Sequence, residues 1–130
     1  MAHDVVTSPE LPPALGPYSP VVRVGELLFL SAQTGVDPAT GSVPEAGGFE
    51  AECRQAFANL EQALRASGSD LRHVVKTMIL YADLADLPVV NKVYAETFPT
   101  DPPARTAAIV GLAGDRRIAV DGVAALPDGT

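Results

Sequence analysis

The apolar and polar residues follow two different periods along the chain. From Phe49 to Ser67, apolar residues recur at steps of three or four, with charged residues mostly between them. This pattern predicts an amphipathic helix that ends before Gly68. A second helix is predicted from about Leu87 to Phe98. Asp86 can cap this helix, and Pro88 fits its first turn.

Shorter runs rich in β-branched and large apolar residues predict strands before, between and after the helices. These runs are residues 21–24, 26–33, 74–82, 105–111 and 117–125. The order ββ-α-β-α-ββ predicts an α+β protein in which two helices cover one face of a sheet. The 130-residue length suits one domain, expected over residues 15–130. Residues 1–14, with three prolines, are predicted to form an extended tail.

Several predicted strands are apolar at both odd and even positions, including the segments 27–30, 78–80 and 118–120. Successive residues of a strand point to opposite faces of the sheet, so both faces require burial. Two helices can cover only one of them, and the other would be an exposed apolar surface on a monomer. We therefore expect a homo-oligomer that packs through the sheet. The alternative is that the loop of residues 34–48 covers this face.

Composition and charge limit the classes of function that the chain can have. The net charge is −7, from 16 acidic and nine basic residues, and this argues against nucleic-acid binding because that requires neutralisation of phosphates. No apolar run approaches membrane-spanning length, and the N-terminus lacks the features of a signal peptide. A lone cysteine, Cys53, allows no intrachain disulfide. These observations predict a soluble cytoplasmic protein without a membrane or nucleic-acid partner.

Arg105 and Asp121 are the two charged residues that the pattern does not explain. Arg105 opens an apolar strand-like run, and a guanidinium in such a place requires an anion because arginine stays protonated. Asp121 interrupts an apolar strand, where a carboxylate must be paired or exposed. Either the two form a structural ion pair between neighbouring strands, or Arg105 binds a ligand anion and Asp121 orients water beside it. The spacing alone does not decide between these alternatives.

The sequence lacks a phosphate-binding glycine loop, a metalloprotease motif, a CxxC pair and a nucleophile elbow. His3 lies in the tail and His73 beside a turn, so a histidine-based triad is not indicated. Tyr18, Ser31 and Asn91 are weaker candidates, since each has an ordinary structural role available to it.

Taken together, these residues resemble the RidA/YjgF/UK114 family of reactive-intermediate deaminases over about residues 15–125. The matching pieces are Gly16-Pro17-Tyr18, Leu30 to Gly35, Asp37 to Gly41, Val75-Lys76-Thr77, Asp83-Leu84, Val90 to Tyr94, Pro103 to Thr106 and Ile118 to Ala124. Their order and spacing are specific for the superfamily.

The resemblance implies a chorismate-mutase-like fold and a homotrimer with sites at its subunit interfaces. It also implies that Arg105 clamps a substrate carboxylate, that Asp121 positions water, and that Tyr18, Ser31 and Asn91 help form the cleft. The implied reaction is hydrolysis of 2-imino or enamine acids, such as 2-iminobutanoate and 2-iminopropanoate, to 2-oxo acids and ammonia. No metal or organic cofactor is implied.

Three positions depart from the pattern of the family. Its deaminases usually have glutamate at the position of Asp121, often have cysteine at that of Ala107, and commonly have glycine at that of Ala32. Two alternatives in the same cleft are non-catalytic binding of a small carboxylate and hydrolysis of another imine or enamine in a dedicated pathway. A ribonuclease or translation-inhibitor role, attached to some relatives, agrees less well with the charge of −7.

Overall fold

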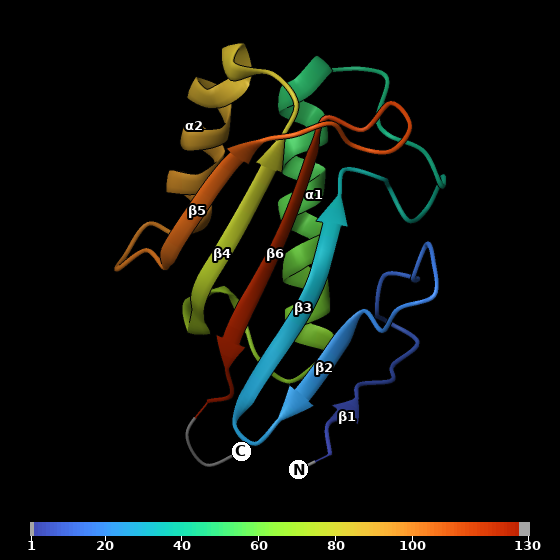
Figure 1. The fold of residues 1–130 in the computed structure, drawn as a ribbon, viewed down its shortest axis with the longest axis vertical. Helices are drawn as coiled ribbons and strands as arrows, with labels where there is room; N and C mark the ends of the chain where they lie inside the picture. The colour runs from blue at the N-terminus through green and yellow to red at the C-terminus, as the bar shows by residue number, and fades with distance from the viewer. Residues whose placement is uncertain (1, 128–130) are drawn as a thin grey trace.

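A single mixed sheet with two helices on one face forms the protein, as the computed structural model of residues 2–127 shows (Figure 1). The six strands are β1 (Asp4–Val5), β2 (Val21–Val24), β3 (Leu27–Thr34), β4 (Val74–Tyr81), β5 (Ala104–Ile109) and β6 (Ile118–Ala125). They are arranged in the order β1-β2-β3-β6-β4-β5. Among the described strands, only the β4–β5 pair is parallel. The predicted α+β class is therefore confirmed.

The two helices, α1 (Gly48–Ala66) and α2 (Leu87–Thr97), lie where the periodicity places them. Gly68 ends α1 as predicted: its φ of 87° is left-handed, and Ser69 N donates to Leu64 O at 2.9 Å. Asp86 stands at the start of α2, but its side chain makes no capping hydrogen bond. Asp83 caps instead the preceding 3₁₀ turn, η2 (Leu84–Asp86), by accepting from Ala85 N at 2.9 Å.

The core lies between the sheet and the helices. Leu28, Ile79 and Val120 of three neighbouring strands are fully buried in one core cluster with Leu60 and Leu64 of α1. A cluster of three aromatic rings from α1, α2 and the turn after α2 continues the core, formed by Phe57, Tyr94 and Phe98. Burial of these apolar side chains is the main stabilising term of the fold.

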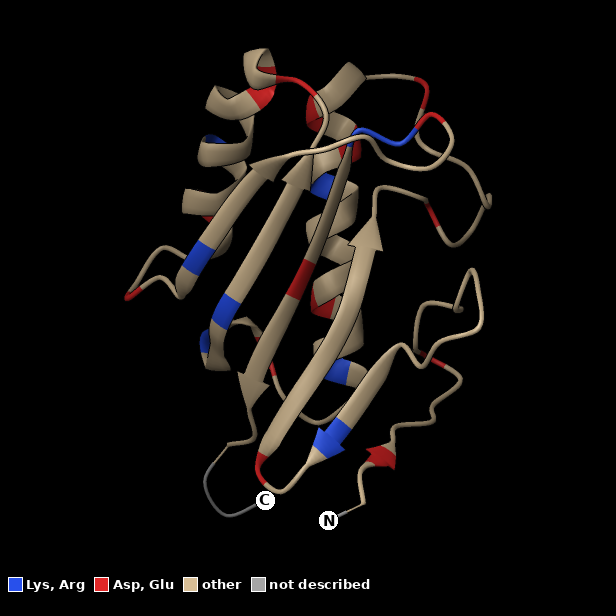
Figure 2. Cartoon of the chain, in the orientation of Figure 1, with Lys and Arg blue, Asp and Glu red and all other residues tan. Residues whose placement is uncertain are grey.

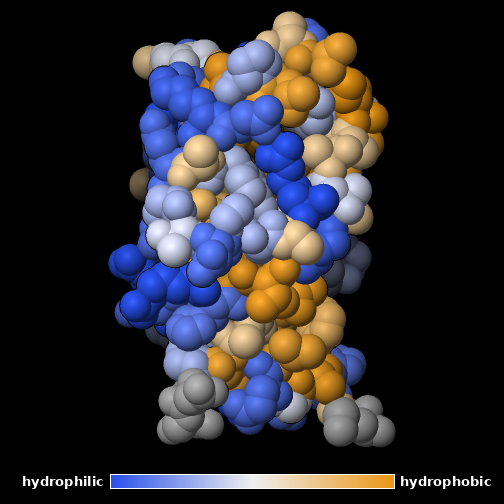
Figure 3. All heavy atoms as spheres, turned by 90° about the vertical axis from the view of Figure 1, so that its left-hand side faces the viewer, coloured by the Kyte–Doolittle hydropathy of each residue, from blue (hydrophilic) through white to orange (hydrophobic). Residues whose placement is uncertain are grey.

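The other face of the sheet remains open. Leu27, Phe29 and Met78 are 40%, 44% and 38% exposed on it. Charged residues are sparse along the strands (Figure 2), and hydrophobic surface gathers along the sheet side of the molecule in Figure 3. The 34–48 loop lies beyond the end of β3 and does not cover these side chains (Figure 1). The alternative of a covering loop is therefore wrong, while packing through the sheet stays a prediction.

Two local features differ from the sequence-based expectation. Residues Asp4 and Val5, inside the predicted tail, form β1 and pair with Arg23 and Val22. A strand of two residues is too short to give a periodic signal. In addition, Glu52 is fully buried although its position on the predicted helix is polar.

Glu52 explains how α1 is fixed against the start of β6. Its carboxylate accepts from Arg117 N at 2.7 Å and from Arg117 Nε at 2.8 Å, so both oxygens are satisfied. Gly35 passes so close to this turn of α1 that a Cβ there would lie 2.5 Å from Glu52 Cγ. This contact orients the end of β3 against the helix.

Candidate carboxylate-binding site

Arg105 lies on β5 and points to the helix side of the sheet. It is in register with Thr77 of β4, a fully buried residue of that face. Its guanidinium carbon lies 4.9 Å from the centre of the Tyr94 ring, which comes from α2. This cation–π contact places the guanidinium without neutralising it. Among residues 2–127, no carboxylate pairs with Arg105.

Tyr94 is itself held in place by a hydrogen bond to Thr77. Its hydroxyl and the Thr77 hydroxyl are 2.8 Å apart and buried, and either can be the donor. Burial raises the pKa of Tyr94 above its usual range, so the ring stays neutral under the guanidinium. The result is a rigid aromatic platform for a charged group. The sequence placed Tyr94 only within a predicted helix and did not indicate this role, because the pairing of β4 with β5 is not visible in the sequence.

An open groove of about 410 Å³ begins at Arg105 and runs between α2 and the segment leading into β5. Its lining residues are Asn91, Tyr94, Ala95, Phe98, Pro99, Pro102, Pro103 and Arg105. The walls are mostly apolar, with an arginine and the Asn91 amide as polar groups. Grooves of this kind orient a small ligand through a few polar contacts. Arg105 and Asn91, both predicted from the sequence, are thus brought together.

Tyr18 and Ser31 form a second group, on the side of the sheet where β2 and β3 lie. Ser31 Oγ donates to Ser19 O at 2.7 Å, and Ser31 N donates to Pro20 O at 2.9 Å. The Tyr18 hydroxyl accepts from Leu15 N at 3.1 Å, and 45% of the residue is exposed. Ser31 lies where the β3–β6 register shifts, so the strand is irregular beside it.

Asp121 lies on the open face of the sheet. It is in register with Met78, whose backbone N donates to Asp121 Oδ1 at 3.0 Å. Partial burial raises the pKa of this carboxyl, and the Met78 hydrogen bond and the charge of Lys76 partly offset that rise. Its second oxygen makes no hydrogen bond to the described part of the chain.

An ion pair between Arg105 and Asp121 within one chain is excluded by the sheet. Strand β4 lies between β5 and β6. Arg105 is level with Thr77 and Asp121 with Met78, and adjacent residues of a strand point to opposite faces. The two side chains therefore lie on opposite sides of the sheet, and Arg105 is left for another anion.

Within residues 2–127, no cluster of three His, Cys, Asp or Glu side chains is arranged to hold a metal ion. The described helices include none that is long and apolar enough to span a membrane.

The fold and the groove define a class: an α+β protein of the chorismate-mutase-like type with a guanidinium exposed in an apolar groove. The chain belongs to the family described as endoribonuclease L-PSP, the RidA/YjgF family, because the model of that family matches residues 9–126. A human relative named 2-iminobutanoate/2-iminopropanoate deaminase is 38% identical over 121 residues, which cover 92% of this chain and 88% of the relative.

Two solved structures are also similar to this chain. RidA from the Antarctic bacterium Psychrobacter sp. has a TM-score of 0.88 and 31% identity, over 95% of this chain and 99% of its own. TdcF from E. coli, solved with bound serine, has a TM-score of 0.87 and 26% identity, over 95% of this chain and 99% of its own.

Proposed function

We propose that this protein hydrolyses 2-imino acids of the 2-iminobutanoate and 2-iminopropanoate type, or their enamine tautomers, to 2-oxo acids and ammonia. The observation that carries the proposal is the Arg105 guanidinium, held over Tyr94 at an apolar groove with no carboxylate of its own chain as partner. Relatives that are named as deaminases of these substrates, such as the human protein, support it. TdcF with bound serine supports a ligand that carries a carboxylate.

Arg105 acts first by holding the substrate. Two parallel N–H donors of a guanidinium match the two oxygens of a carboxylate and fix its plane. The imine carbon next to that carboxylate is then held at a fixed position, and the side chain of the substrate lies along the apolar wall formed by Phe98 and Pro103.

Asp121 acts on the water. As the water oxygen bonds to the imine carbon, Asp121 takes a proton from it, and the imine nitrogen takes a proton from solvent to give a carbinolamine. The C–N bond then breaks, ammonia leaves with the proton that Asp121 returns, and the carbinolamine hydroxyl gives its proton to solvent as the C=O of the 2-oxo acid forms. The substrate is already electrophilic, so this hydrolysis needs no metal ion or organic cofactor.

A complete site requires two chains in this proposal. Arg105 and Asp121 of one chain lie on opposite faces of the sheet, so one substrate cannot contact both. A homotrimer packed through its open faces provides the second chain and covers Leu27, Phe29 and Met78. Tyr18 and Ser31, on the strand side away from β5, complete the cleft next to Arg105 of a neighbour. Cytoplasm is the proposed compartment, in keeping with the unpaired Cys53.

The test is release of ammonia and 2-oxo acid from 2-iminobutanoate, generated in the assay by a pyridoxal-phosphate dehydratase acting on threonine. The wild type is expected to accelerate release over buffer, and Arg105→Ala to lower kcat/KM by about a hundredfold or more, ~2.7 kcal/mol. Arg72→Ala is the matched control, because Arg72 is exposed and, among residues 2–127, pairs only with Asp70. No acceleration by the wild type would contradict the proposal. Saturable 2-oxo acid binding without turnover would identify a carboxylate binder instead.

A further inference from the structure

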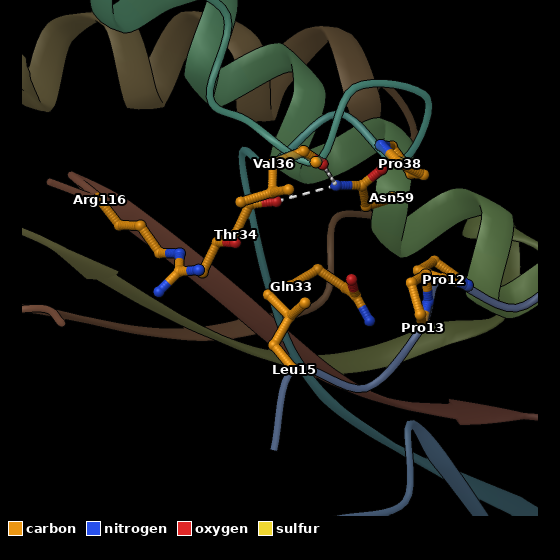
Figure 4. A pocket seen from close by; sticks show the side chains of 10 residues that line it. Pro12, Pro13, Leu15, Gln33, Thr34, Val36, Pro38, Asn59 and Arg116 are labelled. Carbon is orange, nitrogen blue, oxygen red and sulfur yellow. Dashed lines mark hydrogen bonds between the residues drawn. The ribbon is translucent and has the colours of Figure 1, made fainter. Parts of the chain in front are cut away.

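A second pocket lies on the helix side of the sheet, between the N-terminal segment, the end of β3 and α1 (Figure 4). Its volume is about 100 Å³, enough for several water molecules or one small organic molecule. The lining residues are Pro12, Pro13, Leu15, Gln33, Thr34, Val36, Pro38, Gly41, Asn59 and Arg116. Strands β6 and β4 separate β3 from β5, so this pocket is distinct from the Arg105 groove.

Arg116 is the charged group of this pocket and lacks a partner in the described chain. Its Nε is buried and makes no hydrogen bond, and no carboxylate of residues 2–127 forms an ion pair with it. A buried N–H of a charged group normally has an acceptor. In Figure 4 the guanidinium reaches toward Thr34, at the wall of the pocket.

Some of the other polar side chains of the pocket hydrogen-bond to the protein, and others do not. The side chain of Asn59 hydrogen-bonds to the protein through both its nitrogen and its oxygen. Its amide nitrogen donates to Thr34 O at 2.9 Å and to Val36 O at 2.7 Å, and its oxygen accepts from Gln55. Within the described residues, the side chains of Gln33 and Thr34 make no hydrogen bond. Two hydrogen-bonding side chains and one cation therefore line the pocket without protein partners.

Among residues 2–127, no nearby carboxylate pairs with Arg116 in place of a ligand. Asp37 directs Oδ1 to Ala39 N at 2.9 Å, within its own turn. Asp115 precedes Arg116 in the chain, but the two form no ion pair. The remaining lining residues have no polar side chain: they are Pro12, Pro13, Leu15, Val36, Pro38 and Gly41.

We propose that this pocket binds a small monocarboxylate with a short apolar chain, held by Arg116 with help from Gln33 and Thr34. The Nε of Arg116 is buried, but the two Nη groups of an arginine also lie side by side, in a geometry that a carboxylate accepts in a bidentate manner. The proline walls suit a short hydrocarbon chain and not a fully hydrated ion. One cation in a chain of net charge −7 favours a monoanion over a dianion such as phosphate.

Binding of propionate to the Arg105→Ala protein tests this proposal without interference from the other groove. We expect one saturable site per chain by calorimetry, with backbone NMR shifts at Gln33, Thr34 and Val36. Propionamide, the neutral isostere, should bind at least tenfold more weakly, and so should phosphate. The test does not depend on deaminase activity, so it remains valid if the proposed reaction is wrong.

Variants at position 116 complete the test in the same background. Arg116→Leu should weaken propionate binding at least tenfold, and Arg116→Lys, which keeps the charge but loses the paired donors, should weaken it to a smaller extent. Unchanged Tm values establish that both variants fold. The proposal is overturned if propionate does not saturate, if propionamide or phosphate binds equally well, or if Arg116→Leu binds like its parent. The first outcome would mean that ordered water alone occupies the pocket.

Discussion

Arg105 owes its orientation to an uncharged neighbour and not to a carboxylate. Tyr94 lies under the guanidinium, and the Thr77 hydroxyl fixes Tyr94. This arrangement leaves the hydrogen-bond donors of Arg105 directed to the groove, whereas a protein carboxylate would have occupied them. An arginine held in this way is ready to bind an anion at little further cost in ordering.

Asp121 gives a prediction about pH. Burial raises the pKa of this carboxyl, and only its deprotonated form can accept a proton from water. Deaminase activity should therefore rise with pH through a pKa above the usual range for aspartate and fall below that pKa. Asp121→Asn should lower kcat by about 10²- to 10⁴-fold and remove this limb of the profile.

Rates for this profile are measured against the uncatalysed hydrolysis at each pH, because the imine also reacts with bulk water. Asp121→Glu restores the residue usual in the deaminases of the family and should keep the acid limb. Superimposable profiles for the wild type and Asp121→Asn would remove Asp121 from the mechanism.

At the level of single residues, side chains with candidate chemical roles could be identified from the sequence, but the residues that contact them could not. Arg105 and Asp121 stand out because charge in an apolar run requires an explanation. Their separation depends on β4 lying between β5 and β6, a long-range pairing that local pattern does not encode. Glu52 was missed for a related reason, since its partner Arg117 is distant in the chain.

Elements were predictable where their periodic signal is long. Helix α1 and strands β3, β4 and β6 lie within one or two residues of the predicted ranges. Strand β1 was not predictable because its two residues are too short to give a periodic signal and they pair with the distant residues Val22 and Arg23. The capping of η2 by Asp83 was not predictable because it depends on a single local contact. The strand order was also outside the reach of periodicity, since β6 is inserted between β3 and β4.

Gly35 tests how closely α1 is packed against the end of β3. A Cβ there would collide with the backbone oxygen of Glu52 and its Cγ, so Gly35→Ala requires the helix to shift. We expect a loss of about 1–3 kcal/mol in the free energy of unfolding, seen as a Tm lower by several degrees. Gly111→Ala is the control, because nothing lies within 4 Å of its Cβ position and its φ is ordinary.

Both variants are compared at one protein concentration, because the Tm of an oligomer depends on it. Equal Tm values for Gly35→Ala and the wild type would show that α1 can move away from β3 without loss of stability.

For the whole molecule, the open sheet face connects assembly with function. Apolar side chains at both odd and even positions of the strands predicted that one face of the sheet would be uncovered in a single chain. The exposure of Phe29 and Met78 confirms this. Which copy covers that face is not encoded locally, so the trimer and its shared site remain proposals. In the proposed reaction, assembly serves catalysis as well as stability, because Arg105 and Asp121 of one chain lie on opposite faces of the sheet.

The most direct measurement mixes two inactive chains. Arg105→Ala and Asp121→Asn are expressed together with different tags, and the mixed oligomers are purified and assayed with 2-iminobutanoate. A site that takes Arg105 from one chain and Asp121 from another regains both residues at one of the three interfaces of every mixed homotrimer, so the purified mixed oligomers should show about one third of wild-type activity. Mixed oligomers no more active than either parent would contradict a site shared between chains.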